Sequence, residues 1–162
     1  HGIIRQLRPS ALDNLGLREA VEDMVNTWRE RHPDIACGLK LSGELADLGE
    51  AVNITAYRLI QECLTNVLRH ADATRAEIEL RREGGVIHVS VCDDGKGLGE
   101  RSESESARFG LMGIRERVQA LNGEFALESR PAQGLKVSAS IPVRLPDRDG
   151  ASGRSEVKAM AK

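Results

Sequence analysis

Apolar and polar side chains alternate with helical spacing over residues 52–73, VNITAYRLIQECLTNVLRHADA. At 3.6 residues per turn, small and aliphatic side chains form one stripe, which consists of Ala56, Ile60, Cys63, Leu64, Val67 and Ala71. The opposite stripe holds the charged and amide groups of Arg58, Glu62, Asn66 and Arg69, with His70 beside it. The pattern predicts an amphipathic helix that packs on a core through its apolar stripe. A functional polar face and a merely solvated one would both give this pattern.

The same spacing predicts two further helices. One covers residues 15–31, with Asn14 as its N-terminal cap and Pro33 as its stop. The other covers residues 109–122, and the polar segment 98–108 before it predicts a flexible loop.

Shorter stretches of alternating apolar residues predict five strands. They cover residues 35–41, 75–82, 86–91, 124–129 and 135–143. Gly84-Gly85 predicts a tight hairpin between the second and third strands, and residues 131–134 connect the last two. Two hairpins with helices between them predict an α+β fold, a two-layer α/β sandwich in which helices pack on one face of a mixed sheet.

Composition limits the possible function classes. The chain has 162 residues and a formal net charge of −2, so its total charge carries no nucleic-acid or membrane footprint. Aromatic residues make up 2%, which argues against recognition of single strands by base stacking. The three cysteines have neither zinc-site spacing nor an even count, which favours free thiols in a reducing cytoplasm.

The first candidate for chemistry is Asp93-Asp94-Gly95-Lys96-Gly97, which directly follows a predicted strand. Glycines at alternate positions let a ligand approach the backbone closely, and an Asp carboxylate at a strand end can accept a hydrogen bond from a ligand amino group. The spacing excludes the dinucleotide fingerprint, the P-loop and the EF-hand loop. A simple Asp-Gly turn is an equal alternative.

The second candidate is Gly110-Leu111-Met112-Gly113, at the predicted start of the last helix. Free backbone N–H groups at a helix start form an anion site, which the helix dipole favours further. Arg115 and Arg117 lie one turn in and face either a phosphate or solvent. An ordinary glycine-containing helix start is the alternative.

Four motifs follow one another along the chain: Glu62 with Asn66, Asp93-x-Gly95-x-Gly97, Gly110-Leu-x-Gly113 and Pro131-x-x-Gly134. In this order they resemble the N box and the three glycine boxes of the ATP-binding domain of sensor histidine kinases, which has the Bergerat fold. The nitrate/nitrite-sensor subgroup looks similar through LRPSALDNLGLREAV, YRLIQECLTNVLRHADA and GLMGIRERVQALNGEF. The resemblance covers residues 7–142, and the motifs are specific only as a set.

The resemblance implies a role for each polar residue of the first motif. Asn66 would hold Mg²⁺ between the phosphates of ATP, and Glu62 would bind a metal-bound water or polarise the transfer. Arg69 and His70 would lie toward the phosphates. Magnesium keeps several waters and takes few protein ligands, which suits a single Asn.

The glycine boxes would bind the nucleotide. Asp93 would accept a hydrogen bond from the adenine amino group, and Gly95 and Gly97 would shape that pocket. Residues 98–108 would form a mobile lid. The remaining nucleotide-binding residues implied by the second and third boxes are Gly110, Leu111, Gly113 and Gly134, with Gly110 and Gly113 meeting the phosphates.

Three positions depart from the family's pattern. Arg108 stands where the second box often has glycine, and in the third box Ala132 stands where glycine is frequent and Leu135 where threonine is frequent. Because Leu135 has no hydroxyl, one hydrogen bond expected near adenine is missing, a loss of about 1 kcal/mol that water can recover. Arg108 could supply a phosphate contact instead. These departures predict weakened or altered nucleotide binding.

The resemblance implies the catalytic domain of a protein-histidine kinase. With ATP and Mg²⁺ it would phosphorylate a histidine on a dimerisation domain absent from this sequence, for relay to a response regulator, and alone it would not autophosphorylate. Residues 1–14 would end an upstream dimerisation helix and linker, residues 15–145 would form the ATP-binding domain and residues 146–162 a disordered tail. The full-length protein would be a homodimer and a membrane-anchored bacterial sensor, with this domain in the cytoplasm and no nucleic-acid partner.

Two alternatives stay open. The first is a nucleotide-binding or protein-docking module that keeps the fold, has degenerate glycine boxes and performs no transfer. The second is another enzyme of the same ATPase superfamily, such as an anti-sigma serine kinase, which LRPSALDNLGL near the start disfavours.

Overall fold

The computed structural model describes the backbone of residues 10–96, 101–130 and 133–143, and within them the side chains from residue 16 onward except at 70–71, 101–108 and 130. The elements in chain order are α2 (Ser10–Arg31), β1 (Ala36–Ser42), α3 (Glu50–Asn66), the π-helical turn η1 (Val67–Ala71), β2 (Arg75–Glu83), β3 (Val86–Asp93), α4 (Arg101–Ala120), β4 (Glu124–Arg130) and β5 (Gly134–Pro142). All five predicted strands and all three predicted helices are present.

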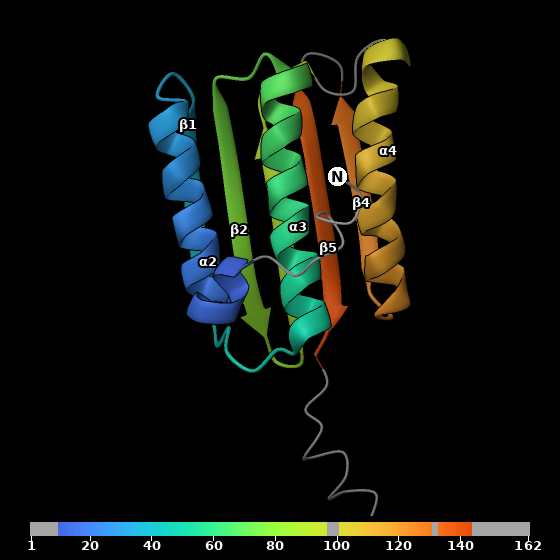
Figure 1. Cartoon of the computed structure of the whole chain (residues 1–162). Coiled ribbons are helices and arrows are strands. Elements are labelled where there is room, and N and C mark those ends of the chain that lie inside the picture. The colour runs from blue at the N-terminus through green and yellow to red at the C-terminus, as the bar shows by residue number, and fades with distance from the viewer. Residues whose placement is uncertain (1–9, 97–100, 131–132, 144–162) are drawn as a thin grey trace, which may run out of the picture.

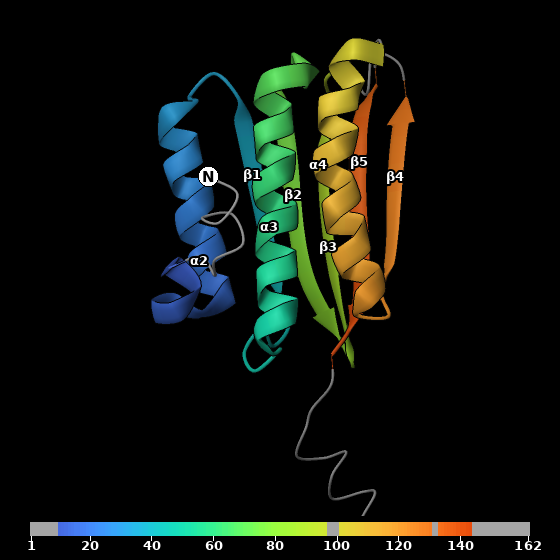
Figure 2. The same cartoon turned by 45° about the vertical axis from the view of Figure 1, so that its right-hand side comes forward.

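The strands form one sheet in the order β1-β2-β3-β5-β4. The β1 and β2 strands pair in parallel, and the other three neighbouring pairs are antiparallel. Figures 1 and 2 show α2, α3 and α4 side by side on one face of this sheet. The predicted α+β sandwich with a mixed sheet and helices on one face is therefore confirmed.

The core lies between the helices and the inner face of the sheet. Period-two alternation turns Ile78 and Leu80 of β2 inward, where they pair with Val91 and Val89 of β3. Val89 in turn pairs with Ala139 of β5, so apolar residues run across the sheet at one level. This continuous inner layer fixes the register of the central strands, because a one-residue slip would expose it.

The α3 helix packs on this layer through its predicted apolar stripe. Ile60, Cys63 and Leu64 are all buried. The helix then widens into η1, which ends at Asp72 with a left-handed backbone, φ 51°. Single π-turns within helices occur often at functional sites. Here the π-turn carries Arg69 from the predicted polar stripe.

The first helix differs from the prediction at its start. The α2 helix begins at Ser10, and its backbone breaks at Gly16, where φ is 74°. Glycine is the residue that adopts this conformation without a steric penalty. The regular helix after Gly16 ends at Arg31, as Pro33 predicted.

The last helix begins earlier than predicted. The α4 helix starts at Arg101, so the segment 98–108 is not a flexible loop throughout, and Gly110 is not a helix start. The prediction failed because the segment was judged by its polarity, whereas Ser, Glu and Ala all tolerate a helix. A single Gly inside a helix costs about 1 kcal/mol and does not end it.

The expected domain ends and part of the lid lie outside the described residues, because these omit 1–9, 97–100 and 144–162. The boundaries proposed from the sequence therefore stay predictions. None of the helices in the described part of the chain is long and apolar enough to cross a membrane.

Candidate functional site

Asp93 closes β3 at the edge of the core and is held from two sides. Its Oδ1 accepts a hydrogen bond of 2.9 Å from the Gly95 backbone N–H, and the backbone N–H of Leu135 also donates to the carboxylate. Partial burial raises the pKa of Asp93, while the two N–H donors oppose this rise. The carboxylate is thus fixed in place and partly shielded from water. The role predicted for Asp93, accepting a hydrogen bond from adenine, stays a prediction.

Gly134 packs directly on this strand end. Its φ is +93°, and a Cβ built on it would overlap the carbonyl oxygen of Asp93. Only glycine allows the start of β5 to approach so closely. Leu135, which follows, is 7% exposed and belongs to the core, while its backbone N–H serves Asp93. Leucine at this position therefore adds apolar packing where a threonine would offer a hydroxyl.

Asn66 is the most buried polar residue of the predicted polar stripe. It is 5% exposed, and its Nδ2 has no hydrogen-bond partner among the described residues. A buried amide donor without a partner is costly, so such a group points to a ligand or a water. The stripe is therefore not a simple solvated face. A functional role for the stripe stays a prediction.

Glu62 faces α4 one turn before Asn66. A Cβ built on Gly110 would overlap Oε1 of Glu62, so α4 approaches α3 closely at this point. Glu62 and Gly110 are therefore neighbours, although Gly110 lies inside the helix and not at its predicted start. The N–H groups of Gly110 and Gly113 are therefore not free helix-start donors. The anion site predicted from such donors has lost its structural basis.

The thiol of Cys63 links the two carboxylates. Burial raises its pKa far above the ordinary value, and the charges of Glu62 and Asp93 raise the pKa further. Both carboxylates therefore lie within electrostatic reach of one buried side chain of α3. Glu62 of α3 and Asp93 at the end of β3 therefore both lie near the Cys63 thiol.

The other predicted site residues are placed less closely. Arg69 is exposed on η1, and it has no hydrogen bond or ion pair within the part of the chain that the structure describes. Leu111 is buried in the core, whereas Gly113 is exposed with open space around it. Gly97 and the side chains of His70 and Arg108 lie outside the described residues.

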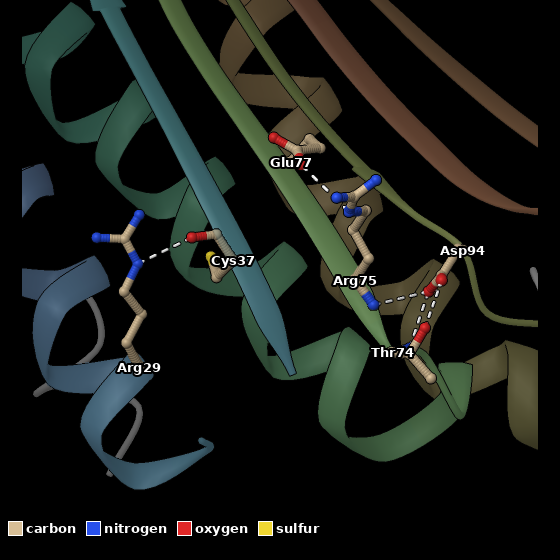
Figure 3. A network of polar contacts seen from close by, with 6 residues as sticks. All are labelled: Arg29, Cys37, Thr74, Arg75, Glu77 and Asp94. Carbon is tan, nitrogen blue, oxygen red and sulfur yellow. Dashed lines mark hydrogen bonds and ion pairs between the residues drawn. The ribbon is translucent and has the colours of Figure 1, made fainter. Parts of the chain in front are cut away.

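The sequence reasoning missed Asp94. Its Oδ1 accepts hydrogen bonds of 2.9 Å from the backbone N–H groups of both Thr74 and Arg75, and its Oδ2 accepts one of 2.6 Å from the Thr74 hydroxyl (Figure 3). The Thr74 hydroxyl is the main cause that lowers the pKa of Asp94. The available signal was a second carboxylate beside Asp93, but its partners lie some twenty residues earlier in the chain.

The site residues fit magnesium of the kind that nucleotides carry. Among the described residues, no group of three or more His, Cys, Asp or Glu could hold a metal ion. Magnesium bound with a nucleotide needs only one or two protein ligands, because phosphate oxygens and waters complete its shell. The buried Asn66 amide supplies one oxygen of the required kind, and its unpaired Nδ2 could donate to a phosphate oxygen.

A family profile identifies the domain that contains these residues. The family described as "Histidine kinase-, DNA gyrase B-, and HSP90-like ATPase" matches residues 51–145, more than half of the chain. The chain belongs to this ATPase family. The match includes the α3 stripe, the Asp93 loop and Gly134, so the geometry described above lies wholly inside the family's domain.

Relatives carry histidine kinase names. The chain is 35% identical over 141 residues to the signal transduction histidine-protein kinase/phosphatase DegS of Brevibacillus brevis, covering 87% of this chain and 36% of DegS. It is 31% identical over 142 residues to UhpB of Salmonella typhimurium (strain LT2), a protein with the same descriptive name, covering 88% of this chain and 28% of UhpB. The chain therefore spans about a third of the length of these relatives.

Solved histidine kinases share the fold. The histidine kinase domain of the Erythrobacter litoralis EL346 blue-light activated kinase superposes with a TM-score of 0.56 at 23% identity, covering 78% of this chain and 61% of that one. The Acinetobacter baumannii kinase AdeS gives 0.59 at 16% identity, covering 84% and 74%. These two structures show the shared fold. The family match and the histidine kinase names of the relatives do not favour a module without transfer. Membership of the nitrate/nitrite-sensor subgroup stays a prediction.

Proposed function

We propose that this domain binds Mg-ATP between the end of β3 and the polar stripe of α3, and that it phosphorylates a histidine on a dimerisation domain of the same protein. The observations that carry the proposal are the Asp93 carboxylate, fixed by the N–H groups of Gly95 and Leu135, and the buried Asn66, whose Nδ2 has no hydrogen-bond partner among the described residues. Relatives named histidine-protein kinase/phosphatase support the reaction class. The phosphoryl group would then pass to a response regulator.

Asp93 would recognise the base. Two backbone N–H groups hold its carboxylate, and its remaining lone pairs can accept a hydrogen bond from the exocyclic amino group of adenine. Guanine carries a carbonyl oxygen at the equivalent position, which a carboxylate repels. The same contact therefore supplies both affinity and selectivity for adenine.

Asn66 and Glu62 would serve the phosphate end. Asn66 Oδ1 would be a magnesium ligand, and the bound ion would neutralise charge on the phosphates. Glu62 would orient a metal-bound water or polarise the attacking imidazole, because its carboxylate faces α4 from the same stripe. Arg69 and His70, on η1, would approach the phosphates. Phosphoryl transfer needs mainly alignment and charge neutralisation, which this set of residues could supply.

Gly95, Gly97 and Gly134 would shape the base pocket, and Gly110, Leu111 and Gly113 would form the wall at the phosphates. For Gly134 and Gly110, the supporting observation is close approach to Asp93 and Glu62. In this proposal Gly110 acts by leaving room for the Glu62 carboxylate, and not by donating free N–H groups.

Calorimetric titration of Mg-ATP into the chain tests the binding proposal. We expect saturable binding that Asp93→Asn weakens by about tenfold or more, because the Asn amide would place a donor against the N–H of Leu135 or against adenine. Asp23→Asn is the matched control, since Asp23 is an exposed carboxylate on α2. Equal affinity for Asp93→Asn and the unaltered chain would refute the assignment of the base site.

Labelled ATP tests the transfer. In the full-length protein we expect label on one histidine outside this chain, and loss of that label in Asn66→Ala. A full-length protein that binds Mg-ATP but incorporates no label would reduce the function to nucleotide binding.

A further inference from the structure

The Asp94 carboxylate joins two segments that are distant in sequence. Its three hydrogen bonds to Thr74 and Arg75 measure 2.6 to 2.9 Å, and the Asp94 backbone N–H donates to the Arg75 carbonyl at 3.2 Å. Both carboxylate oxygens and the backbone are engaged at once. Figure 3 shows the Asp94 carboxylate turned toward Thr74 and the backbone nitrogen of Arg75, while the Arg75 side chain points toward Glu77.

One joined segment carries the proposed base contact. Asp94 lies between Asp93, whose carboxylate would meet adenine, and Gly95, whose N–H holds that carboxylate at 2.9 Å. Displacing the Asp94 backbone therefore moves both members of this pair.

The other segment leads out of the proposed phosphate end. Thr74 and Arg75 follow η1, which carries Arg69 and ends in the left-handed Asp72. The Thr74 carbonyl also accepts a hydrogen bond of 2.9 Å from the Ala36 N–H at the start of β1, so Thr74 is fixed from two sides. The end of η1 therefore has a defined position relative to the sheet.

A second contact joins the same two segments. Lys96 Nζ lies 4.0 Å from Asp72 Oδ2, so the residue after Gly95 pairs with the residue that ends η1. Both side chains are well exposed, and an exposed pair of this length contributes little energy by itself. It nevertheless shows that the segment after β3, residues 94–96 (the base loop), and the end of η1 lie together over more than one residue.

We infer that Asp94 is a positioning residue, which holds the base loop at Asp93 in register with the end of the π-turn so that one nucleotide can engage both. The inference rests on the proposed function, since it assigns the base to Asp93 and the phosphates to the α3–η1 side. Asp94 touches neither end of the nucleotide. It sets the distance between the two groups of residues that do.

The exposure of the contact makes the inference testable. Asp94 and Thr74 are both exposed, so their removal leaves no cavity in the core and no buried orphan, and the variants are expected to fold. A ligand that spans both ends benefits from their alignment, because the second contact then forms within an already bound molecule. A ligand that reaches only one end does not depend on the alignment.

The test compares Mg-ATP with adenosine on the 162-residue chain. For Asp94→Ala we expect Mg-ATP affinity to fall by about tenfold and adenosine affinity by less than about threefold. Asp94→Asn keeps an oxygen for the two N–H donors and should fall between Asp94→Ala and the unaltered chain. Thr74→Val should weaken Mg-ATP and Thr74→Ser should restore it, while Asp23→Asn serves as the control.

A merely structural role would lower the midpoint of urea unfolding and leave the ratio of the two affinities unchanged. Equal losses for Mg-ATP and adenosine, or Mg-ATP affinity within twofold of the unaltered chain, would overturn the inference. Amide hydrogen exchange without ligand separates this failure from that of the proposed function. If the unaltered chain binds no Mg-ATP, the proposed function fails, and the link is still tested: Asp94→Ala should speed exchange at both residues 72–75 and residues 94–96. Faster exchange at residues 94–96 alone would refute it.

Discussion

Replacing Gly110 by alanine would separate the stability of α4 from the geometry of the site. A Cβ at Gly110 would overlap Oε1 of Glu62 and stand 2.7 Å from its Cδ, whereas ordinary van der Waals contact begins at 3.4 Å. The carboxylate would therefore have to move by at least about 0.7 Å. It can do so, because it is the far end of a flexible side chain.

Two opposing effects of Gly110→Ala nearly cancel in the free energy of unfolding, but they do not cancel in the rate of phosphorylation. Alanine in a helix interior is favoured over glycine by about 1 kcal/mol, and an off-rotamer Glu62 would cost about the same. We therefore expect the free energy of unfolding of Gly110→Ala to change by less than about 1 kcal/mol. A misplacement of about 1 Å can lower the rate of an aligned reaction by up to about a hundredfold. We expect phosphorylation by the full-length variant to fall by at least about tenfold.

Gly113→Ala is the comparison on the same helix. Nothing lies within 4 Å of a Cβ built on Gly113, so this variant should gain the helix-propensity term without displacing a described neighbour. For a domain of this size we expect a rise in melting temperature of about 2–4 °C, with phosphorylation reduced less than in Gly110→Ala. The reasoning would be refuted if Gly110→Ala phosphorylated as fast as Gly113→Ala, because Glu62 would then not need the room that Gly110 provides.

Three further predictions concern other parts of the structure. Gly134→Ala should lower the free energy of unfolding in urea by about 2–5 kcal/mol, because the residue has φ +93° and its Cβ would meet rigid backbone at Asp93. A loss below about 1 kcal/mol would contradict this packing. Burial raises the pKa of Asp93, so its carboxylate becomes protonated at a higher pH than an ordinary Asp. As the pH is lowered, the Mg-ATP affinity of the unaltered chain should therefore begin to fall at a higher pH than the affinity of Asp93→Asn. A parallel pH profile in the variant would count against the assignment. Burial raises the pKa of Cys63 far more than that of the half-buried Cys37 and Cys92. When the chain is treated with an alkylating reagent, mass spectrometry should therefore show Cys63 modified last. Early modification of Cys63 would show that α3 opens.

The sequence predicted the elements well because their signals are local. The alternation of Ile78 and Leu80 in β2 and the stripe of Ile60 and Leu64 in α3 record the face that each element buries. The boundary at Pro33 and the turn at Gly84 depend on one or two residues and were also predicted. Periods of two and 3.6 residues therefore identified the layers of the fold.

The start of α4 and the burial of Asn66 could not be read from local signals. Polarity at residues 101–108 describes exposure to water, which a surface helix and a loop share. Asn66 belongs to a polar stripe, but packing in the folded domain leaves it 5% exposed. The burial of Asn66 results from packing between segments, which the residue pattern within α3 does not record.

Contacts between distant residues explain what was missed in the site. Asp94 bonds to Thr74 across twenty residues, and Gly134 meets Asp93 across forty-one positions of the chain. The motif spacing placed Asp93 and Gly134 in one predicted pocket only through the family resemblance. The hydrogen bonds that position Asp93, from Gly95 and Leu135, became visible with the register of β3 and β5.

The central claim is that Mg-ATP binds with its base at Asp93 and its phosphates at the α3 stripe. Backbone amide shifts followed by NMR during a Mg-ATP titration test it most directly. We predict saturable shifts at Gly95, Leu135 and Asn66, with none at Lys40 on the exposed side of β1. Shifts that fail to saturate, or that gather away from Asp93 and Asn66, would contradict the account.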